Sequence, residues 1–305
     1  MSKLRFDDRV VVITGAGNGV GRAHALDFAE RGAKVIVNDL GGSTSGEGAD
    51  KSSADLVVEE IRASGGEATA NYDSVVEGGR IIEAAMDTYG GIDVLVNNAG
   101  ILRDTAFHKM TDENWDIIYD VHVRGAYVLT VKAWPIMRQK GYGRIIFTTS
   151  ASGIYGNFGQ TNYGAAKMGL YGFSQSLAIE GAKKGILVNT IAPIAGSRLV
   201  GDLMPEEIRS VVRSDLVSPL VVKLCSESST ENGGLYEVGV GWFSKLRWER
   251  AKGASLNIHD GITAEDVDAA WDKVVDFSDS EHPKNQQEAG KTPLKNIRSA
   301  KPSKS

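Results

Sequence analysis

A tyrosine and a lysine four positions apart are the residues of this 305-residue sequence best placed to do chemistry. Tyr163 and Lys167 stand at the start of a helical stretch, where this spacing puts both side chains on one helix face. A nearby ammonium favours tyrosinate, so we expect Lys167 to lower the pKa of Tyr163 from its usual ~10. A tyrosine of this kind can accept the proton of a hydroxyl group or return it to a ketone.

Ser150 completes a predicted catalytic set with Tyr163 and Lys167. It follows a strand-like run, Arg144–Thr148, and a serine-rich turn precedes the helix that holds Tyr163. Its hydroxyl group can donate a hydrogen bond to a substrate oxygen and stabilise charge that develops there.

A glycine-rich turn, Thr14-Gly15-Ala16-Gly17-Asn18-Gly19-Val20-Gly21, directly follows the first strand-like run. Glycines allow a tight turn and close approach of a pyrophosphate, and the next helix offers its N–H groups to the phosphates. The pattern alone also fits an ordinary strand–turn–helix, but its place after the first strand favours a dinucleotide site. The predicted cofactor contacts are Gly15, Asn18, Gly19, Val20 and Gly21.

Asp39 ends the second strand-like run, roughly 20 residues after the glycines, where a carboxylate accepts hydrogen bonds from the adenosine ribose. This carboxylate would repel the additional phosphate of NADP, and no arginine follows immediately, so we predict NAD as the cofactor. The alternative is that Asp39 only forms a turn. Asp73, Ser74 and Val75 follow the third run and Asn98 follows the fourth, and we predict that these also contact the cofactor, although polar turns explain them equally.

These residues need a scaffold that brings strand ends together. Short apolar runs alternate with helical periods such as Val20–Arg31, Ala54–Ser64 and Asn162–Lys183. Such alternation predicts an α/β fold with a doubly wound parallel sheet of about seven strands, covered on both faces. The predicted strands are Val10–Thr14, Lys34–Asp39, Glu67–Asn71, Ile92–Asn97, Arg144–Thr148, Ile186–Ile191 and Leu235–Val238.

Three segments depart from this alternation. Gly41–Ser53 is rich in Gly and Ser and predicts a long loop. Thr263 has the character of a helix N-cap, and an apolar stripe runs from Val267 to Val275. Residues 290–305 are rich in basic residues and predict a disordered tail.

Composition narrows the class of partner. The net charge of −5 gives no electrostatic footprint for nucleic acid, and no apolar run approaches the ~18 residues of a membrane span. The five histidines show no paired spacing of metal ligands, so we predict no metal. The single cysteine, Cys225, lies in an apolar stretch and is predicted to be a buried core residue.

The glycine turn, Asn97–Gly100, Ser150, Tyr163 and Lys167 stand in the order and spacing of the short-chain dehydrogenase/reductase superfamily, which residues 5 to about 242 resemble. The resemblance implies a Rossmann-type fold, an oxidoreductase of secondary alcohols and ketones with Tyr163 as its acid/base, and a Lys167 that also binds the nicotinamide ribose. It further implies cofactor contacts by Ala195, Gly196, Ser197 and Arg198.

His122 stands where that family usually has an asparagine that supports a proton relay through water. A histidine there either holds the same water or is a packed core residue. Both alternatives stay open, and His122 is not included in the predicted catalytic set.

The sequence is also similar to the (3R)-hydroxyacyl-CoA dehydrogenases of fatty-acid β-oxidation, as far as about residue 289. This resemblance implies NAD-dependent oxidation to 3-ketoacyl-CoA, one domain over residues 1–289, and a homodimer with the helical extension 243–289 at its interface. The matching stretches are Val37–Gly42, Asn97–Asp104, Ala151–Gln160, Ile191–Arg198 and Asn232–Glu249.

Two other functions remain as alternatives. A 17-beta-hydroxysteroid dehydrogenase would share the same catalytic residues and differ only in its substrate pocket. A non-catalytic cofactor-binding protein is disfavoured because Tyr163 and Lys167 are both present. The resemblance implies the peroxisomal matrix, although the sequence ends in Pro302–Ser305 instead of Ser-Lys-Leu, and a cytoplasmic location is the alternative. The chain is either a standalone dehydrogenase or part of a longer multifunctional protein.

Overall fold

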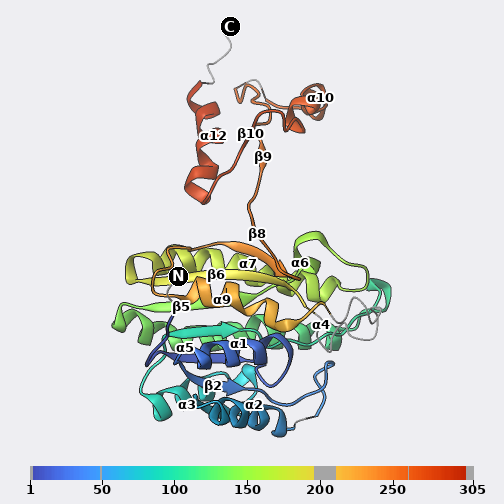
Figure 1. Cartoon of the computed structure of the whole chain (residues 1–305). Coiled ribbons are helices and arrows are strands. Elements are labelled where there is room, and N and C mark those ends of the chain that lie inside the picture. The colour runs from blue at the N-terminus through green and yellow to red at the C-terminus, as the bar shows by residue number, and fades with distance from the viewer. Residues whose placement is uncertain (1–2, 49, 196–210, 260, 300–305) are drawn as a thin grey trace. The chain divides into compact units, whose positions relative to one another are not determined.

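The computed structural model of the chain describes residues 3–48, 50–195, 211–259 and 261–299 (Figure 1). The chain divides into two compact units, Met1–Lys245 and Leu246–Ser305. The division differs from the predicted single domain over residues 1–289, and each unit is described by itself.

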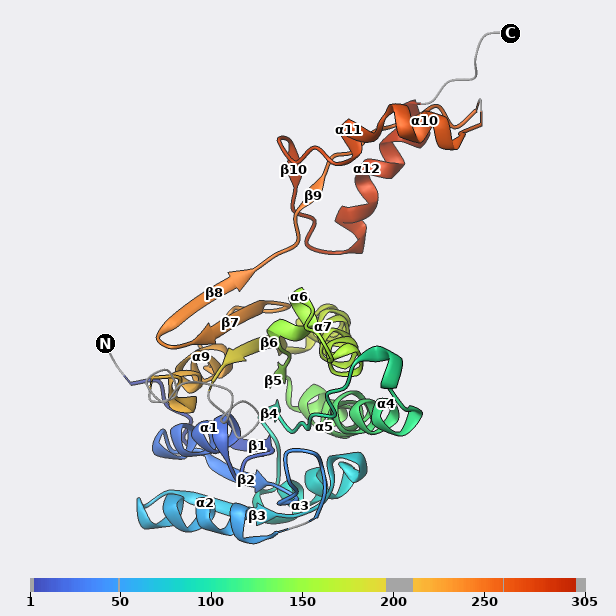
Figure 2. The ribbon, with the colours of Figure 1, turned by 90° about the vertical axis from the view of Figure 1, so that its right-hand side faces the viewer.

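The first unit is built around an eight-stranded sheet with the order β3-β2-β1-β4-β5-β6-β7-β8 (Figure 2). The pairings from β3 through β7 are all parallel, so the predicted doubly wound sheet is confirmed. The eighth strand was not predicted, and it follows a tight turn in which Val240 and Gly241 both have positive φ. The strands are β1 (Val10–Thr14), β2 (Lys34–Asn38), β3 (Glu67–Asn71), β4 (Val94–Asn97), β5 (Gly143–Thr148), β6 (Ile186–Ile194), β7 (Leu235–Gly239) and β8 (Trp242–Leu246).

Helices cover both faces of the sheet and create two apolar cores. Because side chains alternate along a strand, Val11 and Ile13 of β1 enter one core while Val10 and Val12 enter the other. Cys225 is fully buried in the first core, as predicted. The first core is covered by α1 (Gly19–Glu30), α2 (Ser52–Ala63) and α9 (Ser218–Cys225), and the second by α3 (Gly79–Tyr89), α5 (Gly125–Lys140) and α7 (Thr161–Gly181).

Shorter elements complete the first unit at the ends of its strands. Helix α4 (Asp112–Tyr119) passes into α5 through a π-helical segment, Asp120–Arg124, and helix α6 (Ala151–Tyr155) follows β5. Short 3₁₀ helices span Val75–Glu77, Phe107–Lys109, Ala182–Lys184 and Ser214–Leu216. No helix among the described residues is long and apolar enough to cross a membrane.

The second unit holds an antiparallel pair, β9 (Arg250–Ala251) with β10 (Ser280–Glu281), and the helices α10 (Ala264–Ala269), α11 (Trp271–Val274) and α12 (Gln286–Ser299). Thr263 is the N-cap of α10, as predicted, and it also forms a capping box with Asp266.

The predicted disordered tail differs from the structure, because α12 continues through residue 290 to Ser299. This helix is tied to the rest of its unit by Arg250, which donates to the carbonyl oxygen of Ala289 at 2.9 Å, and by Thr292, which donates to Glu281 at 3.0 Å. Residues 300–305 lie outside the described ranges.

Candidate active site

A cavity of about 490 Å³ lies at the carboxyl ends of β1, β2, β4 and β5. Among the predicted site residues, Gly21 does not line it, and Gly196, Ser197 and Arg198 lie outside the described residues. The predicted residues that do line it are Gly15, Asn18, Gly19, Val20, Asp39, Asp73, Ser74, Val75, Asn98, Ser150, Tyr163, Lys167 and Ala195.

The glycine turn forms the floor of this cavity under the N-terminus of α1. Gly15 and Gly19 have φ values of 64° and 55°, a region that favours glycine. Gly21 acts through packing, because a Cβ there would overlap the carbonyl oxygen of Gly15 and lie 2.6 Å from Nδ2 of Asn98. Asn18, the N-cap of α1, makes no capping hydrogen bond with its side chain, which leaves the N–H groups of the first turn for a phosphate. The floor therefore fits a dinucleotide.

Asp39 links the glycine turn to the loop that follows β2. One carboxylate oxygen accepts from the backbone N–H of Gly17 at 2.8 Å, and the other accepts from that of Gly41 at 2.7 Å. The carboxylate also lines the cavity, and its bond to Gly41, two residues further on, closes a turn.

Two asparagines support this end of the cavity and were missed from the sequence. Asn38 donates to Oδ1 of Asn71 at 2.8 Å and to the carbonyl oxygen of Asp73 at 2.9 Å. Asn71 in turn donates to the carboxylate of Asp73 at 2.8 Å. Their one sequence signal is an amide side chain at the end of a predicted strand.

Asn98 holds the glycine turn in place. Its Nδ2 donates to the carbonyl oxygens of Thr14 at 3.0 Å and Gly15 at 3.2 Å. The hydroxyl group of Thr14 accepts from the backbone N–H groups of Asn98 and Ala99, both at 3.1 Å. These bonds join the ends of β1 and β4.

The loop after β2 forms a further wall of the cavity. Thr44 accepts a hydrogen bond at 3.0 Å from the backbone N–H of Leu102, and Glu47 pairs with Arg103 at 3.4 Å. Since β1 lies between β2 and β4 in the sheet, this loop passes over the glycine turn. The predicted loop over 41–53 is slightly shorter in the structure because α2 begins at Ser52.

At the other end of the cavity, Lys167 is buried and its Nζ donates to the carbonyl oxygen of Thr148 at 2.7 Å. The same Nζ lies 5.4 Å from the centre of the Tyr163 ring. Burial lowers the pKa of Lys167 to about 7, because no carboxylate among the described residues compensates the loss of water around the ammonium.

Burial raises the pKa of Tyr163 to about 12, and the hydrogen bond from Ser150 only partly opposes this increase. The charge of Asp104 raises the same pKa further. The expectation that the pKa of Tyr163 lies below its usual value is therefore wrong. Desolvation of the phenol dominates, which the four-residue spacing could not indicate.

Three polar residues beside Tyr163 were not predicted. Asn157 donates to Gln160 at 2.9 Å, and Gln160 donates to the carboxylate of Asp104 at 2.7 Å. All three line the cavity. They join the segment after β4 to the start of the helix that holds Tyr163.

A doubly wound parallel sheet, a glycine turn after its first strand, and a serine, a tyrosine and a lysine around one cavity define a dinucleotide-dependent oxidoreductase that acts on a hydroxyl group. The family described as short chain dehydrogenase matches residues 9–197, and the chain belongs to this family.

Relatives are similar over almost the whole chain. The peroxisomal multifunctional enzyme type 2 of Mus musculus is 56% identical over 289 residues, which are 94% of this chain and 39% of that protein. The putative short-chain type dehydrogenase/reductase Rv0148 of Mycobacterium tuberculosis is 47% identical over 89% of this chain and 95% of its own length. The solved structure of full-length peroxisomal multifunctional enzyme type 2 from Drosophila melanogaster aligns with a TM-score of 0.83 at 43% identity, over 97% of this chain and 50% of that one. The chain thus spans two fifths to one half of these multifunctional relatives.

Proposed function

We propose that the chain oxidises (3R)-hydroxyacyl-CoA to 3-ketoacyl-CoA with NAD as the hydride acceptor. The observation that carries this proposal is the placement of Ser150, Tyr163 and Lys167 around one cavity with the glycine turn and Asp39. The similarity to peroxisomal multifunctional enzyme type 2 supports the acyl-CoA substrate and a peroxisomal location.

Tyr163 is the proposed general base for the 3-hydroxyl group. Ser150 donates a hydrogen bond to the same substrate oxygen and keeps it beside Tyr163. When bound, the nicotinamide ring accepts hydride and brings a positive charge that favours the ionised form of a nearby tyrosine. Lys167 is held against Thr148, close to where the nicotinamide ribose would bind.

Asp39 supports the choice of NAD. Its carboxylate lies at the cavity wall with both oxygens bound to backbone N–H groups, so it is fixed in place. A fixed negative charge repels the additional phosphate of NADP. The glycine turn would hold the pyrophosphate, and Asp73, Ser74, Val75 and Ala195 would line the rest of the cofactor site. We expect NAD to bind at least about tenfold more tightly than NADP, as measured by NADH and NADPH fluorescence titrations.

Turnover tests the substrate. Purified protein with NAD is given (3R)-hydroxyacyl-CoA, its (3S) isomer or estradiol, and NADH formation is followed. Fast turnover of the (3R) ester alone is the expected result. Turnover of estradiol with an inert ester would replace the substrate with a steroid and leave the catalytic residues unchanged.

The apolar stripe of the second unit is proposed to lie at a homodimer interface. Val267, Trp271 and Val275 are 39%, 53% and 49% exposed, which is costly for large apolar side chains in water. We expect light scattering to give the mass of a dimer, and Trp271→Ser to shift the protein toward monomer. A wild-type monomer would contradict the proposal.

A further inference from the structure

His122 separates the catalytic cavity from a second, much smaller one. It lies in the π-helical segment between α4 and α5, a kind of irregularity that is common at functional sites. Its imidazole is buried at 2% exposure and lines both cavities. The smaller cavity measures about 10 Å³ and is also lined by Asn97 and Thr14, whereas Lys167 lines only the larger one.

The imidazole is fixed from three directions. Its Nε2 lies 2.9 Å from the carbonyl oxygen of Ile101 and 3.2 Å from the backbone nitrogen of the same residue, in the segment after β4. Its ring meets the ring of Tyr163 edge to face, with centres 5.4 Å apart and an angle of 86°. A Cβ on Gly100 would overlap Cε1 of His122, so only glycine fits there. His122 therefore packs between the catalytic tyrosine and the wall made by Gly100 and Ile101.

Two buried polar atoms at this place have no partner among the described residues. They are Nδ1 of His122 and Oδ1 of Asn97, whose Nδ2 donates to Thr130 at 3.4 Å. A neutral Nε2 cannot both donate to the carbonyl oxygen of Ile101 and accept from its N–H, and the contact to the oxygen is the shorter one. We therefore assign the proton to Nε2, which leaves Nδ1 of His122 and Oδ1 of Asn97 as hydrogen-bond acceptors. A cavity of this volume corresponds to about one water molecule, and one water supplies two donors.

We propose that His122 and Asn97 bind one buried water between Nδ1 and Oδ1, and that this water makes His122 a positioning residue for Tyr163. The bound water fixes the imidazole tautomer with Nε2–H on Ile101, and the ring then holds Tyr163 and the Gly100–Ile101 wall in place. The positioning role rests on the proposed function of Tyr163 as the base. Because Lys167 does not line the small cavity, this water is separate from the ammonium.

The charge state of His122 agrees with this role. Burial and the charge of Lys167 lower the pKa of His122 well below its usual range, so the ring is neutral at pH 7. A neutral ring has one bare nitrogen, which needs a donor when it is buried.

The water and the tautomer are tested by ¹⁵N NMR of imidazole nitrogens and by a high-resolution crystal structure of the full chain. His24 is a matched control, because it is fully buried, bonded at Nδ1 to Ser218 at 2.8 Å, unpartnered at Nε2, and lines neither cavity. We expect His122 to carry its proton on Nε2 between pH 6 and 8, with one water between Nδ1 and Asn97. A dry cavity, or a proton on Nδ1, would overturn the proposal.

Asn97→Leu removes the acceptor that orients the water. We expect it to change the ¹⁵N shifts of His122 but not those of His24, and to lower kcat roughly tenfold while the KM for NAD stays unchanged. Unchanged shifts and kcat would overturn the proposal. If the variant does not fold, the wild-type tautomer and the crystal structure still decide the question. These two measurements involve no turnover, so they also separate this proposal from a failure of the proposed function.

Discussion

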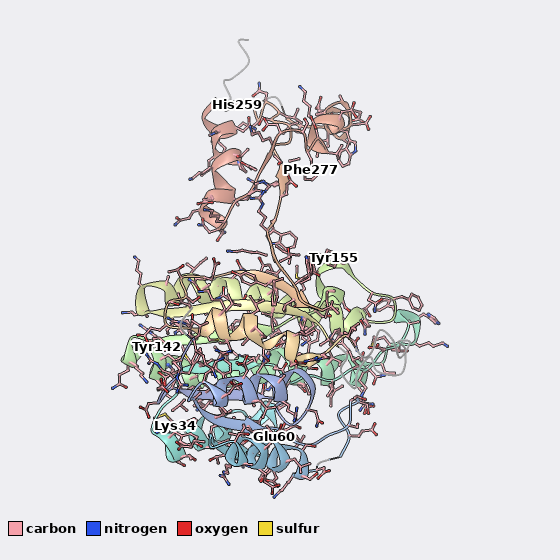
Figure 3. All side chains as sticks on the ribbon, in the orientation of Figure 1. Lys34, Glu60, Tyr142, Tyr155, His259 and Phe277 are labelled. Atoms are coloured by element: carbon pink, nitrogen blue, oxygen red, sulfur yellow. The ribbon has the colours of Figure 1, made fainter. Side chains whose placement is uncertain are left out.

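Asp93 and Lys167 are buried ionisable groups at opposite ends of the same sheet, and they differ in the charge of the groups that surround them. Asp93 precedes β4 at the amino ends of the strands, and its partner Arg9 lies over the ring of Tyr142, which Figure 3 labels. Asp93 accepts hydrogen bonds from Arg9 at 3.1 Å and from the backbone N–H of Val10 at 3.0 Å, and it forms an ion pair with Lys140 at 2.5 Å. Lys167, at the carboxyl ends, has one neutral partner, the carbonyl oxygen of Thr148.

The difference separates a structural charge from a functional one. Opposite charges compensate Asp93 for the water it loses, so it can contribute to stability. Lys167 remains beside a cavity without a carboxylate partner in the described part of the chain, and its pKa falls to about 7. Buried charge alone does not mark a site, whereas buried charge that the fold leaves uncompensated next to a cavity does.

The largest expected effect is that of Lys167→Met on the pH dependence of the free energy of unfolding. As pH falls from about 10.5 to about 7, the unfolded chain takes up a proton on Lys167 and the folded chain does not. The free energy of unfolding of the wild type should therefore fall, relative to the variant, by about 1.4 kcal/mol per pH unit in this window. The difference should be constant below pH 7. Urea titrations of the cofactor-free proteins measure the free energy of unfolding of wild type and variant at each pH. If the difference between the two does not change from pH 7 to 10.5, the lowered pKa of Lys167 is contradicted.

Asp93→Asn should destabilise the protein and leave catalysis intact. The variant leaves Arg9 and Lys140 without their buried partner, but both cations are partly exposed, so we expect a loss of about 2–3 kcal/mol. Urea unfolding and steady-state kinetics measure the two effects on one preparation. A large change in kcat would remove the distinction between the two ends of the sheet.

Gly21→Ala tests the cavity floor. The added Cβ would overlap the carbonyl oxygen of Gly15, and crowding of this kind costs about 1–3 kcal/mol. We expect NADH to bind about tenfold to a hundredfold more weakly, as measured by fluorescence titration. Gly172→Ala is the matched control, because its Cβ would meet nothing within 4 Å, and it should leave binding unchanged. Equal affinities in the two variants would show that packing at Gly21 is unimportant.

Asp104→Asn should have the smallest effect. The carboxylate of Asp104 raises the pKa of Tyr163, and an asparagine still accepts the hydrogen bond of Gln160 without the charge. With a lower pKa, Tyr163 loses its proton at lower pH, so the acid limb of the kcat/KM profile for oxidation should move to lower pH. The exposed Asp112 provides a control, since Asp112→Asn should not move the profile. A shift to higher pH in Asp104→Asn would contradict the assigned effect of the charge.

Most of the parallel strands were predictable because they are continuous or nearly continuous apolar runs, as in β1 and β4, which is a local property of the sequence. Strand β8 was missed because its pattern does not alternate, with both Trp242 and Phe243 exposed. Helix α12 was missed because the side chains that hold it, Arg250 and Glu281, lie outside the segment that forms it.

The candidate site shows the same limit. Motif order was enough to place Ser150, Tyr163 and Lys167 around one cavity. The bond between Gln160 and Asp104 joins residues 56 apart, which no local pattern reveals. The pKa of Tyr163 was predicted in the wrong direction because spacing reports proximity of a charge and gives no measure of burial.

The most direct test of the central claim is NADH formation from (3R)-hydroxyacyl-CoA by Tyr163→Phe compared with the wild type. The account predicts a rate lower by about 10²–10⁴-fold, the usual contribution of a general base. NADH affinity should stay within about threefold, because the phenol is not part of the cavity floor. A variant that turns over the ester at the wild-type rate would contradict the assignment of Tyr163 as the base.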